Sequence, residues 1–261
     1  MRRLFFLVLT VLAVVYCSGC AGTVDKQNDA AKKQSYVVQD VRGKKLSFES
    51  KPQKIISLYV YGDEVLLGLV DHKRIAGLSK WVHDEDLAMG AKEAKDVPQI
   101  AESNPEAILA LKPDLVLLPD SSKPEQISSL ENVGIKVFVY PAASRMSNIP
   151  KTIKAIGGGG GGAAGGGDEP EQAEKLIAEM QKKISAVEAK VKKMQPEDRK
   201  KGLLFLRFGA IGGKGIIFND IMTAAGVEDC YEAARHTIAD KPGTSRILSK
   251  EEVVQANPDY I

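Results

Sequence analysis

Cysteine is scarce in this chain, with three among 261 residues, and two of these, Cys17 and Cys20, lie close to the N-terminus. If Cys20 is modified, Cys230 is the one free thiol of the mature chain, which excludes an internal disulfide framework. An excess of charge of one sign is lacking as well, because 36 Lys and Arg residues balance 34 Asp and Glu residues. No bulk charge therefore points to a nucleic-acid partner.

Sequence motifs of catalysis and metal binding are also lacking. There is no G-x-S-x-G and no H-E-x-x-H, and His72, His83 and His236 show no helical i,i+4 pairing. The glycines from Gly209 to Gly215 do not match a phosphate-binding loop. A triad of separated residues remains possible on sequence grounds, and the "HDED" stretch from His83 is more typical of a solvated helix start than of a cation site. We expect no catalytic residues, metal ligands or cofactor.

Long hydrophobic runs are confined to the N-terminus. A positive start is followed by the apolar run 4–16, which is shorter than the roughly 20 residues that span a bilayer. Small residues precede Cys20 as in a bacterial lipobox, although Cys17 stands where that motif usually has Leu. This pattern predicts a lipoprotein signal peptide over 1–20 with Cys20 lipidated, or else a plain signal peptide. Polar residues then predict a flexible tether over 21–35.

Short apolar strands alternate with helical patterns over residues 36–156. The stretch 36–48 alternates apolar and polar residues around Arg42-Gly43, as in a β-hairpin. Buried strands are then expected in "KIISLYV", "RIAGLS", "DLVLLP" and "KVFVY", with helices in "DEVLLGLV", "PEAILAL" and "KPEQISSLENVG". This alternation predicts an α/β N-terminal lobe with a parallel sheet.

The next segments differ in composition. Residues 157–167 form a glycine-rich linker of low complexity. Residues 168–196 carry one apolar stripe at spacings of three and four, with a capping pair at Asp168 and Glu171 and a stop at Pro196. We expect a single long helix here rather than a coiled coil, because fewer than three full heptads are present.

A second βα alternation occupies residues 197–261, so the fold class is α/β with two lobes joined by one helix. The last stretch, "EEVVQANPDYI" from Glu251, repeats "EAILALKPDLV" from Glu106, with Pro-Asp at the same offset from Glu. One element of each lobe is therefore duplicated.

These segments resemble the periplasmic binding proteins for iron complexes and vitamin B12, the substrate-binding components of ABC importers. The resemblance rests on "DVRGKKLSFESKPQKIISLYVYGDEVLLGLV", "RIAGLS", "NPEAILALKPDLVLL", "GIKVFVY", the spanning helix and "LSKEEVVQANPDYI". It implies two Rossmann-like lobes with parallel sheets joined by one long rigid helix, the class III arrangement. The family's second lobe continues beyond this strand, so we expect an incomplete C-terminal lobe.

Ligands of open α/β sheets bind at the carboxyl ends of the strands. Aromatic faces and a few polar anchors there suit a ferric chelate, haem or corrinoid. The alternatives are a core position for Tyr59, a surface position for Trp81, a helix cap for Ser121 and an ion pair for Arg207. The candidate cleft residues are Tyr59, Tyr61, Trp81, Ser121, Ser144, Arg145, Arg207 and Phe208.

The resemblance also implies partners and a location. Glu106 and Glu251 match the glutamates with which the family docks its two lobes onto an ABC permease dimer, which works with separate ATPase subunits. A monomer is expected, lipid-anchored on the outer side of a bacterial membrane. An extracytoplasmic enzyme or sensor that reuses the fold, or a receptor for a bare metal ion, is the alternative.

Overall fold

The structure is a computed structural model, and it describes residues 35–100, 104–158, 169–206, 209–212, 216–230 and 246–261. The predicted signal peptide, Cys20, the tether up to residue 34 and most of the glycine-rich linker lie outside these residues. Within the described ranges, none of the helices combines the length and the apolar character needed to cross a membrane.

The N-terminal lobe is built on a parallel sheet of five strands in the order β5-β4-β3-β6-β7. Its central strands are fully buried apolar runs, as expected when helices cover both faces. The predicted parallel sheet is confirmed. The strands are β3 (Ile55–Ser57), β4 (Ile75–Ser79), β5 (Gln99–Ile100), β6 (Leu115–Pro119) and β7 (Val137–Tyr140).

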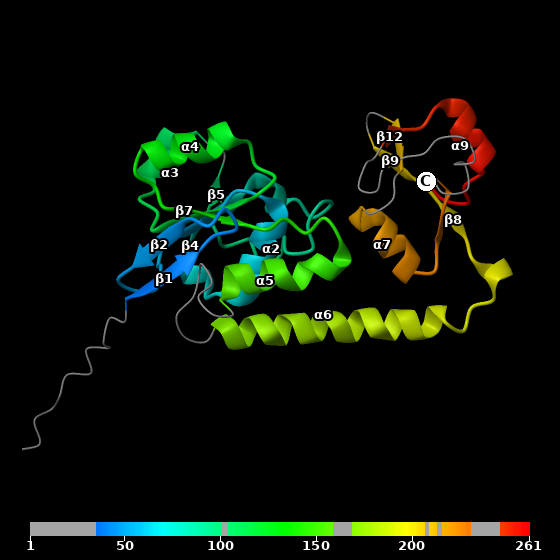
Figure 1. The fold of residues 1–261 in the computed structure, drawn as a ribbon, viewed down its shortest axis with the longest axis horizontal. Coiled ribbons are helices and arrows are strands. Elements are labelled where there is room, and N and C mark those ends of the chain that lie inside the picture. Colours follow the sequence, from blue (N-terminus) through cyan, green and yellow to red (C-terminus); the bar gives the residue numbers. More distant parts are fainter. Residues whose placement is uncertain (1–34, 101–103, 159–168, 207–208, 213–215, 231–245) are drawn as a thin grey trace, which may run out of the picture. The chain divides into compact units, whose positions relative to one another are not determined.

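Successive side chains of this sheet enter two separate cores. Leu115 and Leu117 pack with α2 (Val60–Leu69) and α5 (Ile149–Gly157), whereas Val116 and Leu118 pack with α3 (Pro105–Ala110) and α4 (Pro124–Asn132). Figure 1 shows α3 and α4 on one side of the sheet and α5 on the other. Because successive side chains of a strand point to opposite faces of the sheet, helices pack on both faces and the lobe has three layers.

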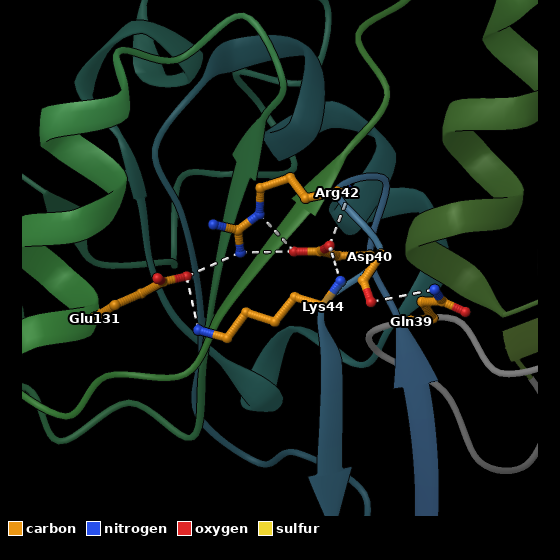
Figure 2. Close-up of polar contacts among 6 residues, drawn as sticks. Gln39, Asp40, Arg42, Lys44 and Glu131 are labelled. Atoms are coloured by element: carbon orange, nitrogen blue, oxygen red, sulfur yellow. Dashed lines mark hydrogen bonds and ion pairs between the residues drawn. The ribbon is translucent and has the colours of Figure 1, made fainter.

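A hairpin of β1 (Tyr36–Gln39) and β2 (Lys45–Phe48) covers the β7 edge of the sheet, where Val41 N–H donates to the carbonyl of Val139. Figure 2 shows the polar contacts that fix its turn. Asp40 accepts from the backbone N–H groups of Arg42 and Lys44, and both of these side chains reach Glu131 on α4, at 2.8 and 3.0 Å. The predicted hairpin is confirmed, and it also protects a sheet edge.

One boundary was predicted wrongly. The stretch "KIISLYV" was expected to be a strand throughout, but β3 ends at Ser57, Tyr59 precedes the first turn of α2, and Tyr61 lies within that helix. Short 3-10 helices connect some of the described elements: η1 (His72–Arg74), η2 (Lys80–His83), η3 (Met146–Asn148) and η4 (Pro196–Asp198).

The long helix α6 (Glu169–Val191) has 23 residues, or about 35 Å at 1.5 Å per residue. It ends before the predicted stop at Pro196, which begins η4 instead. Ala173 and Leu176 pack against the core that contains α2 and α5, and Val191 contacts Gly226 just after α7 (Ile217–Ala224). The apolar stripe therefore joins the helix to elements before and after it.

The C-terminal residues form smaller sheets than expected. β8 (Lys201–Gly202) pairs in parallel with β11 (Glu228–Asp229), and Gly202 forms a parallel bridge with Tyr260. The apolar stretch 202–206 divides between β8 and β9 (Leu204–Leu206). The three-stranded sheet β12-β10-β9 is antiparallel, with β10 at Gly209–Gly212, β12 at Arg246–Ile247 and α9 (Lys250–Ala256) following.

Candidate ligand-binding site

Tyrosines gather where strands β3 and β7 end. Tyr59 and Tyr61 flank the start of α2, and the Tyr61 ring meets the edge of Tyr140 at a centroid distance of 5.8 Å. The Tyr61 hydroxyl lies 3.5 Å from Ser121 Oγ, just beyond β6. Burial raises the pKa of Tyr61, so its hydroxyl stays protonated and can donate a hydrogen bond.

Tyr61 and Ser121 line a cavity of about 680 Å³ between α2, α5 and α6. Its volume falls within the range of roughly 300–1,000 Å³ typical of small-molecule sites. Hydroxyl groups of Tyr61, Ser121 and Ser144 lie among a mostly apolar wall. The other lining residues are Glu64, Val65, Ala142, Ala143, Ile149, Thr152, Ile153, Leu176, Met180 and Ile217.

Three of the predicted cleft residues, Tyr61, Ser121 and Ser144, are thus brought together. Tyr59 does not line the cavity: it packs against the second core and donates to Gln126 Oε1 at 3.3 Å, which agrees with the core alternative. Trp81 lies outside the wall as well and is half-exposed, with Lys80 Nζ 4.5 Å from its ring centroid. Arg207 and Phe208 lie outside the described residues.

Arg145, also predicted to bind ligand, has a protein partner. Its guanidinium donates two hydrogen bonds to Asp220 on α7, at 2.7 and 2.5 Å, and Met146 N–H donates to the same carboxylate. The bonds from Arg145 lower the pKa of Asp220 and keep it ionised. Ser144 and Ile217 both line the cavity, so this ion pair lies beside it.

The apolar wall was not predicted from the sequence. Glu64 and Val65 lie three and four residues after Tyr61, so they share its helical face, and this spacing would have found them once Tyr61 was placed on a helix. Met180 belongs to the apolar stripe of α6, which was read as packing only.

Comparison with known proteins identifies the family. Residues 55–261 match the family described as periplasmic binding protein. The chain belongs to the periplasmic binding protein family. It is 25% identical to an uncharacterized ABC transporter substrate-binding lipoprotein, YvrC, of Bacillus subtilis, over 96% of this chain and 77% of that protein. It is also 25% identical to a vitamin B12-binding protein of Pectobacterium atrosepticum, over 80% of this chain and 71% of that protein.

Solved structures show the same fold. The haem-binding protein HmuT superposes with a TM-score of 0.66 at 21% identity, covering 91% of this chain and 74% of HmuT. The vitamin B12-binding protein BtuF of Vibrio cholerae gives 0.56 at 18% identity, covering 80% of this chain and 74% of BtuF. The expected class III periplasmic binding protein fold, with a parallel sheet and one long helix, is thereby confirmed.

The two glutamates singled out in this periplasmic binding protein occupy equivalent helix positions. Asn104 caps α3 and Ser249 caps α9, and Glu106 and Glu251 are each the second residue of their helix, exposed to solvent. Hydrogen bonds from its own backbone N–H and from Ser249 lower the pKa of Glu251, which keeps it ionised. A carboxylate in the first turn is also favoured by the helix dipole.

A buried carboxyl group lies between α2 and the end of β4. Asp63 on α2 is fully buried, and its Oδ2 accepts from Ser79 N–H at 3.1 Å and from Ser79 Oγ at 2.5 Å. Burial raises the pKa of Asp63 to about 7, and the bonds from Ser79 oppose this only in part. No sequence motif pointed to this residue.

Metal binding finds little support among the residues that the structure describes, where no three His, Cys, Asp or Glu side chains cluster suitably. His83, at the start of "HDED", lies with Nε2 3.0 Å from the carbonyl of Val97 and Nδ1 3.3 Å from that of Ser79. It therefore braces the ends of the loop after β4. His236 lies outside the described residues.

Proposed function

We propose that the chain is the substrate-binding component of an ABC importer and captures a haem, a corrinoid or a ferric siderophore in the cavity beside α6. The observation that carries the proposal is the cavity itself, which lies at the carboxyl ends of the strands in a periplasmic binding protein. It performs no chemistry on the ligand.

The chemistry of the wall suits such ligands. The apolar side chains Val65, Ile153 and Leu176 offer a surface to a macrocycle or a chelate backbone, and the three hydroxyls supply directional hydrogen bonds. Similar proteins are named for vitamin B12 and haem, which supports a large metal chelate as the ligand of this chain too.

The protein then delivers its ligand to a membrane permease. Cys20 carries a lipid that holds the protein at the outer side of a bacterial membrane, and Glu106 and Glu251 dock onto basic pockets of the permease dimer. ATP hydrolysis takes place on separate subunits. The name of the Bacillus subtilis relative, a substrate-binding lipoprotein, supports the anchored arrangement.

Ligand titration tests the proposal. Cyanocobalamin, haemin and ferrichrome are each added to the full chain, and the fluorescence of Trp81, the single Trp, is followed. We expect saturable quenching at one ligand per chain with at least one of the three. Ser144→Phe should fill the cavity and weaken binding at least tenfold, whereas Ser128→Phe, on the exposed face of α4, should not. Failure of all three ligands to bind would contradict the proposal.

A further inference from the structure

The loop between β4 and β5 exposes three large apolar side chains. Trp81, Leu87 and Met89 are 51%, 61% and 94% exposed, so Met89 has almost no contact with the protein. Buried residues of the same loop fix it to the core, namely Val82, Ala88, Ala91, Ala94 and Val97. The loop is therefore well anchored and still directs apolar surface outward, a property of binding sites.

Glu64 ties this loop to the cavity. Its side chain lines the cavity wall, and its Oε1 accepts from the backbone N–H groups of Met89 at 2.8 Å and Gly90 at 3.2 Å. A Cβ at Gly90 would lie 3.2 Å from Leu67 Cδ1, so glycine permits the loop to approach α2 this closely. The backbone of Met89 is thus held within hydrogen-bond distance of a residue of the wall.

Glu64 is shared by the cavity and the loop. Glu64 and Val65 line the cavity from α2, and the backbone of Met89 is hydrogen-bonded to Glu64. Methionine is flexible and polarizable, so it adapts to flat faces and aromatic rings. A ligand that fills the cavity and extends past Glu64 would meet the loop that carries Met89.

Building on the proposed function, we infer that Met89 is a ligand-contacting residue that packs on the flat face of a tetrapyrrole macrocycle, and that Glu64 positions it. A hydroxamate siderophore has no such face and would gain little from Met89. The loop after β4 then sets a preference for haem or a corrinoid over a ferric hydroxamate.

Binding measurements on the full chain test this inference, with haemin, cyanocobalamin and ferrichrome as probes and Trp81 fluorescence as the signal. We expect Met89→Ala to raise the Kd for the tetrapyrrole about tenfold and Met89→Leu to restore it to within about twofold, since leucine supplies a similar apolar area. Val37→Ala, at an exposed position on the hairpin, is the matched control and should leave the Kd unchanged.

Variants of Glu64 separate positioning from direct contact. Glu64→Ala should weaken tetrapyrrole binding, and Glu64→Gln, whose amide oxygen still accepts hydrogen bonds, should retain most of it. In the Met89→Ala background, Glu64→Ala should cause little further loss, because the side chain it positions is gone. A purely structural Glu64 would instead show the same loss in both backgrounds, which would overturn its positioning role.

The possible failures are distinguishable. Equal tetrapyrrole affinity of Met89→Ala and the unmodified chain would overturn the inference and leave the proposed function standing. Binding of ferrichrome alone would do the same. Failure of the unmodified chain to bind any of the three probes would overturn both.

Discussion

Asp63 is a carboxyl group without exposure to solvent, held between α2 and β4 by Ser79. Its pKa is raised from 3.8 to about 7, so the folded protein keeps a proton that the unfolded chain releases. The free energy of unfolding therefore falls as the pH rises from about 4 to about 7, where the buried carboxyl ionises. A shift of about three pKa units corresponds to about 4 kcal/mol at most.

We predict that Asp63→Asn stabilises the protein at pH 8 by about 2 kcal/mol, because a neutral amide can accept from Ser79 without the penalty of a buried charge. At pH 5 the gain should largely disappear, since Asp63 is then protonated. Urea unfolding at both pH values measures the difference. Parallel pH profiles for the two proteins would show that Asp63 does not titrate in this window.

The repeated element has a structural explanation at the scale of helix and strand. After α3 and after α9, one residue adopts a left-handed backbone directly before Pro-Asp, Lys112 with φ 52° and Asn257 with φ 46°. These are the two non-glycine residues with positive φ in the described part of the chain. The repeated sequence therefore specifies the end of a helix followed by a turn.

The Asp of each repeat then fixes the start of a neighbouring strand. Asp114 Oδ2 accepts from Gln53 N–H at 2.7 Å and Lys54 N–H at 2.9 Å, and Asp114 N–H donates to the carbonyl of Lys54. Asp259 accepts from Lys201 N–H at 2.8 Å and donates to its carbonyl. Lys54 precedes β3 and Lys201 begins β8, so the Asp of each repeat holds the start of a neighbouring strand in place.

Asp114→Ala should lower the free energy of unfolding by about 1–2 kcal/mol, because two backbone N–H groups lose a charged acceptor and water replaces it only in part. The midpoint of urea unfolding measures the loss, and faster hydrogen exchange at Gln53 and Lys54 would locate it. Asp114→Asn keeps one oxygen acceptor and should lose less. An unchanged midpoint in Asp114→Ala would contradict the clamping role.

Local patterns were sufficient to predict most elements of the N-terminal lobe. The strands β6 and β7 were predicted from short buried apolar runs, and the end of α4 from Gly134. Such features depend on residues close together in sequence, so the pattern of apolar and turn residues is sufficient to predict them. The β3–α2 boundary failed because Tyr59, Val60 and Tyr61 favour strands intrinsically, and packing of α2 on the sheet overrides that preference.

Contacts between distant residues account for what the sequence did not reveal about the site. Asp220 pairs with Arg145 across 75 positions, and Glu64 holds Met89 across 25. Neither Asp220 nor Glu64 belongs to a motif, so only the folded arrangement shows that they contact Arg145 and Met89. Tyr61, Ser121 and Ser144 lie together because the carboxyl ends of parallel strands meet at one edge of the sheet.

At the scale of the whole molecule, the proposed docking of Glu106 and Glu251 makes a prediction about transport. Charge reversal at either position, Glu106→Lys or Glu251→Lys, should reduce uptake by cells severalfold and leave the ligand Kd of the purified protein unchanged. Both carboxylates are exposed and neither lines the cavity, so affinity has no reason to change. Reversal of both should reduce uptake further, because each would remove an attraction to a basic permease pocket.

Glu125 provides a matched control for this experiment. It is also exposed at the second position of a helix, after Pro124, as Glu106 follows Pro105. Glu125→Lys therefore imposes the same unfavourable charge on a helix dipole. If uptake falls equally in Glu125→Lys and Glu106→Lys, the loss of uptake would result from general destabilisation and not from lost docking. Loss of uptake confined to Glu106 and Glu251, with ligand affinity intact, would instead support these two residues as the contacts with the permease.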